Sequence, residues 1–250
     1  MLFRSVVFVL PWMDDYRIIG TTDVVHQGDA DKVACTNDER DYLIAAYNRN
    51  FRQQIRPQDL VWSWSGVRPL LDDGRAAASN ITRDYKLDLR RHGTSGYLSI
   101  FGGKLTTHRK LAEQVMQLLA PLLPGLKPAW TDSAPLYGGA LSEAGLTELS
   151  WQAPKNLDPL IVRRWLRTYG SQTEALFNTL NSRPVLGRVV AGSITEAELR
   201  YTADIEDART AADFLGRRTK MFLSLSPREQ DDIAAFFGSS TDELRVFRHD

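Results

Sequence analysis

The stretch from Ile100 to Thr107, with the sequence IFGGKLTT, has the residue types of a site for an anion or for the edge of an electron-rich ring. A β-type run ends at Gly102 and Gly103, and the chain then enters a predicted amphipathic helix through hydroxyl residues. Paired glycines permit positive φ and a close approach of the backbone. A helix start adds unpaired N–H groups at the positive end of its dipole. The segment is the first candidate for chemistry.

A strand-to-helix turn without a ligand is the alternative for the same segment. In that interpretation Thr106 or Thr107 caps the helix and Lys104 lies in solvent. The spacing alone does not choose between the two. A Walker loop is excluded, because the pattern G-x-x-x-x-G-K-[ST] is missing.

Two arginines form the second candidate, Arg68 in SGVRPL and Arg83 in ITRDY. The proline after Arg68 restricts it to an extended backbone. Two guanidinium groups at strand ends could converge on one phosphate or carboxylate through forked, charge-assisted bonds. The alternative is a set of surface pairs, Arg68 with Asp72 or Asp73 and Arg83 with Asp84, which contribute little. For isolated arginines this alternative is the preferred one.

Other candidates are weaker. The segment Ile19–Asp23 closes a predicted strand with a glycine and short polar residues, and a turn is preferred there over a ligand contact. The histidines at 26, 92, 108 and 249 have no metal-binding spacing, so no metal site is predicted. Clusters such as Arg163-Arg164 and Arg217-Arg218 are expected on solvated helix faces.

Composition sets the class of the protein. The 250 residues include 31 basic and 31 acidic side chains, 43% hydrophobic residues and the single Cys35. These values are those of a globular chain, and a net charge of zero argues against a nucleic-acid partner. No apolar run approaches the roughly 20 residues that span a bilayer. The apolar stretch Met1–Leu10 is predicted to be a strand rather than a signal peptide.

Two domains are expected, 1–128 and 129–250, with net charges of +3 and −3. The first is a mixed α/β body, and residues 1–100 should leave an open sheet with exposed apolar surface and edges. Its predicted strands are Val6–Trp12, Tyr16–Thr22, Leu60–Ser65, Lys86–Arg90 and Tyr97–Phe101. Its predicted helices are Asp38–Ile55 and a stretch after Thr107 with an apolar stripe at Leu111, Val115, Leu118, Leu119 and Leu122.

The second domain is predicted to be all-helical after a loop-like stretch over Trp130–Pro154. Its predicted helices are Asp158–Tyr169, Ser171–Leu180, Thr195–Asp204, Asp207–Leu215 and Pro227–Phe237. Capping patterns are expected at Ser171 with Glu174 and at Ser226 with Glu229.

Five motifs in chain order, FVLPW, IIGTTD, SGVRPL, TRDY and IFGGKLTTHRKLAE, resemble the FAD-dependent glycerol-3-phosphate dehydrogenases, which are membrane-associated respiratory enzymes. The resemblance is close over about residues 1–137, where LYGGA is similar to the family's LPGGA, and looser through the helical tail. It covers the carboxy-terminal half of such an enzyme. The implied fold is part of a D-amino-acid-oxidase-like body, α+β or mixed α/β, followed by an all-helical domain.

The resemblance implies roles for the candidates above. Arg68 and Arg83 would hold the substrate phosphate, and Lys104 would lie near the reacting flavin nitrogen as a catalytic cation. Contacts with FAD are implied for Gly102, Gly103, Lys104, Leu105, Thr106 and Thr107. The implied reaction oxidises sn-glycerol 3-phosphate to dihydroxyacetone phosphate, with a hydride passed to FAD and electrons passed to a quinone.

The resemblance also implies a cytoplasmic enzyme in peripheral contact with the membrane, and it leaves a homodimer open. His108 departs from the tyrosine expected there. No G-x-G-x-x-G turn for the FAD pyrophosphate is present, and the proton acceptor would lie upstream. The chain is therefore expected to be a fragment that holds FAD weakly or not at all. Two alternatives stay open: a non-catalytic phosphate-binding remnant with a helical interaction module, and an oxidase that uses oxygen.

Overall fold

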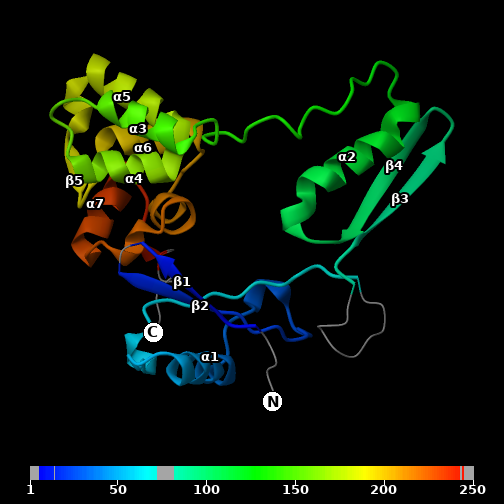
Figure 1. Ribbon diagram of the computed structural model, residues 1–250, viewed down its shortest axis with the longest axis horizontal. Coiled ribbons are helices and arrows are strands. Elements are labelled where there is room, and N and C mark those ends of the chain that lie inside the picture. The colour runs from blue at the N-terminus through cyan, green and yellow to red at the C-terminus, as the bar shows by residue number, and fades with distance from the viewer. Residues whose placement is uncertain (1–5, 14, 72–81, 243, 245–250) are drawn as a thin grey trace. The chain divides into compact units, whose positions relative to one another are not determined.

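The computed structural model describes residues 6–13, 15–71, 82–242 and 244. The chain divides into two compact units, Met1–Ser133 and Ala134–Asp250 (Figure 1). The described residues of the first unit form two hairpins and two long helices, and those of the second unit are mainly helical.

The first hairpin joins β1 (Phe8–Trp12) to β2 (Tyr16–Gly20) in antiparallel register, with Leu10 opposite Ile18. Helix α1 (Asn37–Asn50) follows and begins with a capping box between Thr36 and Glu39. The predicted helix to Ile55 was too long. The Asn48 side-chain amide donates to Ile55 O (2.9 Å) and accepts from Ile55 N (2.8 Å), so the chain turns back at the helix end.

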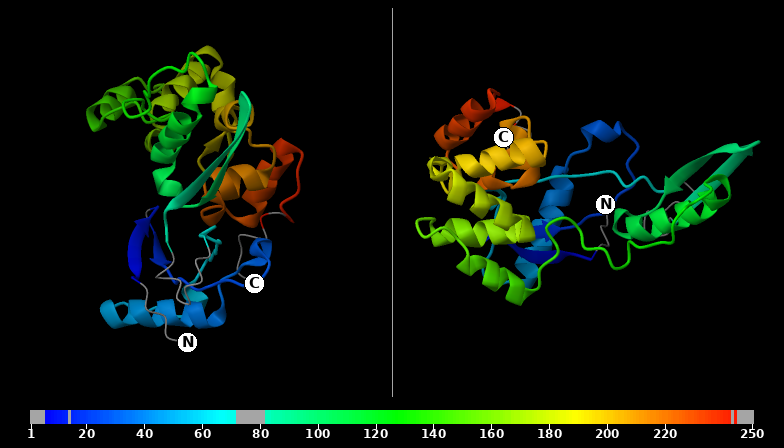
Figure 2. Two further views of the ribbon diagram at one scale, coloured as in Figure 1. Left: turned by 90° about the vertical axis from the view of Figure 1, so that its right-hand side faces the viewer. Right: turned by 90° about the horizontal axis from the view of Figure 1, so that it is seen from above.

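The second hairpin pairs β3 (Tyr85–His92) with β4 (Ser95–Gly102), as the sequence predicted within a few residues. Helix α2 (His108–Leu119) lies along this hairpin and is continued by one 3₁₀ turn, Ala120–Leu122 (Figures 1 and 2). A Cβ on Gly96 would lie 2.8 Å from a methyl group of Leu122. The end of the apolar stripe that follows α2 therefore packs against the hairpin at Gly96, where the hairpin has no side chain.

The predicted strand Leu60–Ser65 is wrong, since these residues are extended without a ladder partner. Trp62 and Trp64 stack on each other instead, with ring centroids 4.6 Å apart. Residues with high β-propensity form a strand only where a neighbouring strand lies beside them to pack against. The described strands of this unit form two separate two-stranded hairpins rather than one open sheet.

The second unit contains five α-helices among its described residues. They are α3 (Glu143–Trp151), α4 (Pro159–Tyr169), α5 (Thr173–Ser182), α6 (Glu196–Ile205) and α7 (Pro227–Phe237). Helix α7 and its capping box at Ser226 and Glu229 match the prediction. Helix α3 was missed inside the predicted loop over Trp130–Pro154. Its N-cap is Ser142, whose side chain accepts from Gly145 N.

Three further features of this unit differ from the prediction. A short hairpin of β5 (Val189–Ala191) and β6 (Ile194–Thr195) interrupts the helices. Ser171 is not a cap, because a 3₁₀ turn precedes α5 and places Gln172 at its N-cap. The predicted helix Asp207–Leu215 is displaced to a start near Ala211 and a π-helical turn over Asp213–Arg218.

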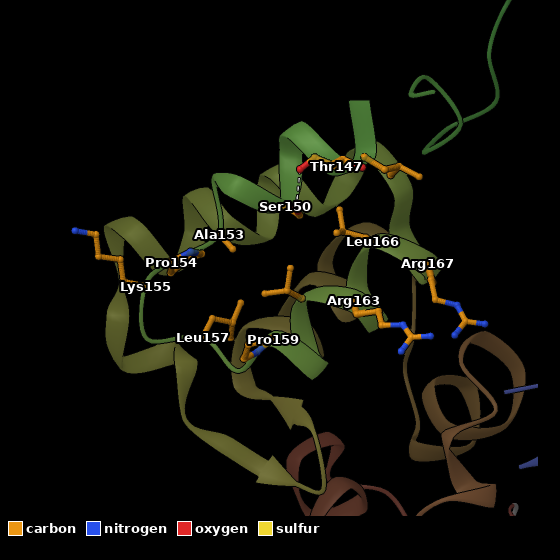
Figure 3. A pocket seen from close by; sticks show the side chains of 12 residues that line it. Thr147, Ser150, Ala153, Pro154, Lys155, Leu157, Pro159, Arg163, Leu166 and Arg167 are labelled. Carbon is orange, nitrogen blue, oxygen red and sulfur yellow. Dashed lines mark hydrogen bonds between the residues drawn. The ribbon is translucent and has the colours of Figure 1, made fainter. Parts of the chain in front are cut away.

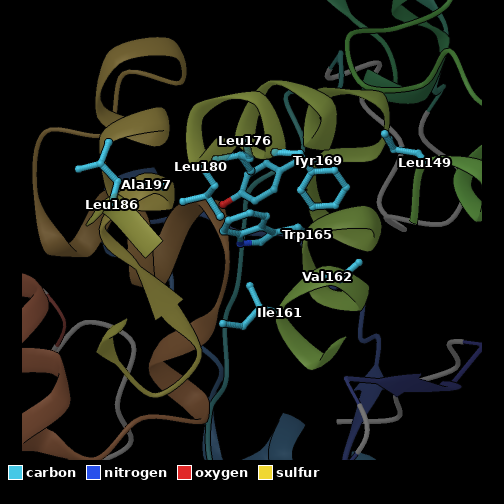
Figure 4. Close-up of a cluster of buried hydrophobic side chains, with 10 residues drawn as sticks. Leu149, Ile161, Val162, Trp165, Tyr169, Leu176, Leu180, Leu186 and Ala197 are labelled. Carbon is cyan, nitrogen blue, oxygen red and sulfur yellow. The ribbon is translucent and has the colours of Figure 1, made fainter. Parts of the chain in front are cut away.

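The buried core lies in the second unit. Its main cluster surrounds Trp165 and Tyr169 on α4 and draws on α3, α5 and α6 (Figure 4). In the described part of the first unit only Tyr47 is a buried hydrophobic residue. Phe8, Leu10 and Trp12, on one face of β1, are exposed, in line with the expected apolar surface.

No helix among the described residues has the length and apolar character needed to cross a membrane.

Candidate functional site

Arg68 and Arg83 meet at one carboxylate, that of Asp23. The Arg68 Nη1 atom lies 2.7 Å from Asp23 Oδ2, and the Arg83 Nη2 atom lies 3.4 Å from the same oxygen. The three residues come from segments 45 and 60 positions apart. The structure therefore brings the two predicted arginines together on a single anionic group.

The partner of these arginines differs from those considered at first. Among the ion pairs of the described residues, Arg83 pairs with Asp23 and not with the adjacent Asp84. Asp72 and Asp73 lie outside the described residues. Asp23 was not identified from the sequence as the ion-pair partner of the two arginines. Its position directly after the second predicted strand could have indicated a polar contact there.

Asp23 is anchored from the side of α1. The hydroxyl of the preceding Thr22 donates to Glu39 Oε1 (2.7 Å), and Glu39 Oε2 accepts from Thr36 N (3.0 Å) in the capping box. Burial alone would raise the pKa of Glu39, but the bonds from Thr22 and Thr36 outweigh it and lower that pKa. An ionised Glu39 thus holds the segment that carries Asp23.

The turn after β4 requires its two glycines. Gly102 and Gly103 have φ values of +71° and +87°. A Cβ on Gly103 would overlap the ring of Tyr85, and one on Gly102 would lie 3.2 Å from Leu71 Cγ. The Tyr85 hydroxyl donates to Thr107 O (2.9 Å) and also contacts Thr107 Oγ1. The first residue of β3 therefore fixes the strand-to-helix turn.

The residues after the glycines face solvent. Lys104, Thr106 and Thr107 are exposed, and Leu105 exposes 86% of its surface. Thr107 stands at the N-cap of α2 without a side-chain cap bond, because its hydroxyl donates to Lys104 O (3.0 Å). The exposed Leu105 between the exposed Lys104 and Thr106 offers apolar surface for contact with another group.

The arginine pair and the glycine turn share their neighbours. Leu71, which touches the Gly102 position, is three residues after Arg68. Tyr85, which covers Gly103, is two residues after Arg83. The segments that carry the two arginines therefore also contact the glycine turn.

These residues fit one edge of a flavin site. The turn presents peptide groups, the Lys104 ammonium and the Thr106 hydroxyl, which suit the oxygen and nitrogen edge of an isoalloxazine. The space over Gly103 belongs to Tyr85, so that glycine serves the packing of the turn. Among the described residues no cluster of three or more His, Cys, Asp or Glu could hold a metal ion.

A groove between α3 and α4 is a concave feature of the second unit (Figure 3). It has a volume of about 640 Å³ and an apolar floor that includes Leu146, Val162 and Leu166. The hydroxyls of Thr147 and Ser150 in its wall donate to helix carbonyls, to Glu143 O and Thr147 O. These two hydroxyls therefore bond to the helix backbone.

Arg164 was expected in solvent and is largely buried. It forms two bonds of 2.5 Å with the fully buried Glu198, which also accepts from the Tyr169 hydroxyl (2.7 Å). Burial and the carboxylate of Glu198 raise the pKa of Tyr169 well above its usual range. This network joins α4 to α6 and extends from Arg164 to Ser193.

Two protein families match this chain, one in each half. Residues 1–109 match the family described as FAD dependent oxidoreductase, and residues 129–236 match the C-terminal domain of alpha-glycerophosphate oxidase. The chain therefore carries a FAD dependent oxidoreductase domain over residues 1–109, followed by this C-terminal domain. The flavin cofactor of this family is FAD, and the turn at Gly102–Thr107 lies inside the matched oxidoreductase region.

Individual curated proteins are similar to this chain over nearly its full length. The aerobic glycerol-3-phosphate dehydrogenase of Escherichia coli is 40% identical over 244 residues, 96% of this chain and 48% of the relative. A glycerol-3-phosphate dehydrogenase of Pseudomonas aeruginosa is 41% identical over 94% of this chain and 47% of its own length. The D-erythritol 1-phosphate dehydrogenase of Brucella abortus is 39% identical over 95% and 48%. The chain spans about half the length of these relatives.

Proposed function

We propose that this chain forms the carboxy-terminal part of a flavoenzyme that oxidises sn-glycerol 3-phosphate to dihydroxyacetone phosphate. The observation that carries the proposal is the meeting of Arg68 and Arg83 at one anionic oxygen beside the glycine turn. An arginine pair of this kind suits a phosphate monoester, whose oxygens accept several N–H bonds at once. The names of the relatives, which act on polyol phosphates, agree with that ligand.

Each residue has a part in this proposal. Arg68 and Arg83 bind the phosphate and orient the carbon chain of the substrate toward the turn. The backbone of Gly102–Thr107 lines the flavin edge, and the Lys104 ammonium stabilises negative charge that develops there. FAD, when bound, supplies the hydride acceptor for C2 of the substrate.

The first unit is built to be covered by more protein. The exposed face of β1 carries Phe8, Leu10 and Trp12, while Val9 on its other face lies against α1. A strand that is apolar on both faces is typical of the interior of a larger sheet. We propose that an amino-terminal segment completes this sheet, binds the FAD pyrophosphate and supplies the general base. A coding region for G-x-G-x-x-G ahead of Met1 would support this, and unrelated sequence there would favour the non-catalytic remnant.

The remaining partners are proposals from the same resemblance. Electrons would pass from the flavin to a quinone, which requires peripheral contact of the complete enzyme with the cytoplasmic membrane. A homodimer is an assembly to test by light scattering. Reduction of a quinone analogue without hydrogen peroxide would support the dehydrogenase, and formation of hydrogen peroxide would favour the oxidase.

The phosphate site is tested with Arg68→Ala and Arg83→Ala in the complete enzyme. Each should raise KM for sn-glycerol 3-phosphate and lower kcat/KM by the equivalent of about 2–4 kcal/mol, because the phosphate loses a charged partner. Arg91→Ala, an exposed arginine on β3, is the matched control and should leave the kinetics unchanged. Unaltered kinetics in both site variants would remove these arginines from the phosphate site.

D-erythritol 1-phosphate is the second candidate substrate. A relative named for that substrate is 39% identical, almost as similar as the glycerol-3-phosphate dehydrogenases. Both substrates carry the same phosphate and differ in the length of the polyol, so the arginine pair does not discriminate between them. A comparison of kcat/KM for the two phosphates decides between the candidates.

A further inference from the structure

Asp23 is the group at which the two arginines meet, and three observations describe its geometry. A single oxygen, Oδ2, takes one N–H from each guanidinium. The side chains of Arg68, Arg83 and Asp23 keep 49%, 40% and 31% of their surface exposed. The segment that carries Asp23 is tied to α1 through Thr22 and Glu39.

Two guanidinium groups that contact the same oxygen atom lie close together, and their positive charges repel each other. A carboxylate between them offsets the repulsion and holds both groups near one point. Because the tie through Thr22 fixes the carboxylate from outside the pair, Asp23 determines where the two arginines meet. Without it the two flexible side chains would separate into solvent, since each is about half exposed.

Asp23 leaves most donors of the pair available. A guanidinium carries five N–H donors, and the described bonds to Asp23 use one from each arginine. Within the described part of the chain, the exposed donors of the cluster can therefore receive an anion while the carboxylate stays in place. The cluster of two cations and one anion has a net charge of +1, which attracts a phosphate dianion.

We infer that Asp23 is a positioning residue that aligns Arg68 and Arg83 for a phosphate monoester. This inference rests on the proposed function and adds a third residue to its phosphate site. The opposite role is that Asp23 occupies the site as a competitor of phosphate. The two roles predict opposite signs: loss of the carboxylate weakens phosphate binding in the first and strengthens it in the second.

The test measures the dissociation constants of sn-glycerol 3-phosphate and inorganic phosphate for the complete enzyme by ³¹P NMR titration. Asp23→Ala and Asp23→Asn should weaken binding about tenfold, and Asp23→Glu should restore most of it. Asp29→Ala, an exposed carboxylate paired with Lys32, is the matched control and should bind like the wild type. Far-UV circular dichroism of each variant separates a lost fold from a lost site, and Asp23→Asn preserves the shape of the side chain.

The outcomes separate the inference from the proposed function. Weaker binding in Arg68→Ala and Arg83→Ala together with unchanged or tighter binding in the folded Asp23 variants would overturn the positioning role alone. No phosphate binding by the wild type, or no loss in the arginine variants, would overturn the phosphate site and the inference with it. Rescue by Asp23→Glu is the result that a merely structural role does not produce.

Discussion

At the side chain of Arg164, burial and pairing act on the pKa in opposite directions. Burial alone would lower the pKa, but the paired bonds to Glu198 outweigh it, and the pKa is raised. The guanidinium also donates to Ser193 O (2.8 Å), so the buried charge is well satisfied. A buried ion pair of this kind contributes little net stability compared with an apolar pair of similar size. Removing one partner, however, leaves the other charge buried without a counter-charge.

Removing one partner of this pair should therefore be costly. We expect Arg164→Ala and Glu198→Gln each to lower the free energy of unfolding by about 3–5 kcal/mol, measured by urea denaturation. Arg209→Ala is the control, because it breaks a pair with Asp207 in which both side chains are exposed, and it should change stability by less than about 0.5 kcal/mol. An equal loss of unfolding free energy in Arg209→Ala and in the two buried-pair variants would show that burial of the ion pair does not increase its contribution to stability.

Gly103 and Gly93 give a matched comparison of two positive-φ glycines. A Cβ on Gly93 meets no atom within 4 Å, whereas one on Gly103 overlaps Tyr85. Gly93→Ala should cost about 1–2 kcal/mol from backbone strain alone. Gly103→Ala should cost more and expose the segment after β4 to limited proteolysis. If both variants are digested at the same rate, the Tyr85 ring does not fix the turn.

Among the elements, the start of the helical turn near Ala211 depends on Asp213. Its Oδ2 atom accepts from Arg209 N and Thr210 N, both at 3.0 Å, and Asp213 N donates to Thr210 Oγ1 (3.2 Å). Burial would raise the pKa of this carboxyl, but these bonds outweigh it and lower the pKa below 3.8. The reciprocal bonds are those of a capping box.

Acid should remove the contribution of Asp213. Because the folded-state pKa is lowered, the stabilisation is complete above about pH 4 and is lost as the pH falls through the folded-state value. Asp213→Asn should cost about 1 kcal/mol at pH 7, and its difference from the wild type should shrink below pH 4 in urea denaturation. Asp204→Asn, an exposed aspartate on α6, should show no such convergence. A difference that stays constant from pH 7 to pH 3 would contradict the capping role.

Helix α7 has a local cause and was predicted well, whereas segments whose structure depends on distant neighbours were not. Helix α7 is specified by Ser226, Pro227 and Glu229 within four residues, and it forms as predicted. Leu60–Ser65 has strand-like residues but no strand beside it among the described residues. Arg164 looks like a surface residue on a helix until Glu198, 34 positions away, is placed against it.

The same distinction applies to the candidate site. The motif around Gly102 and Gly103 predicted a tight turn, because paired glycines report backbone geometry directly. The convergence of Arg68 and Arg83 was a hypothesis from residue type, but the identity of Asp23 as their common partner needed the fold. The roles of these residues toward FAD and phosphate stay predictions.

At the scale of the whole chain, the two units differ in how they bury apolar surface. The second unit buries the large side chains of Trp165, Phe177 and Phe214 almost completely. The first unit leaves Phe8, Leu10 and Trp64 exposed. Burial of apolar surface supplies most of the favourable free energy of folding, so independent stability is expected of the second unit only.

Residues 134–250 produced alone should therefore fold, with a cooperative urea transition and a dispersed NMR spectrum. Residues 1–133 produced alone should bind the dye ANS, show no cooperative transition and aggregate, because their apolar faces and strand edges lack a cover. Phe8→Ser with Leu10→Ser should reduce that aggregation, and Phe177→Ser in residues 134–250 should abolish folding. A cooperative transition of residues 1–133 alone would show that this unit needs no further protein to complete its sheet.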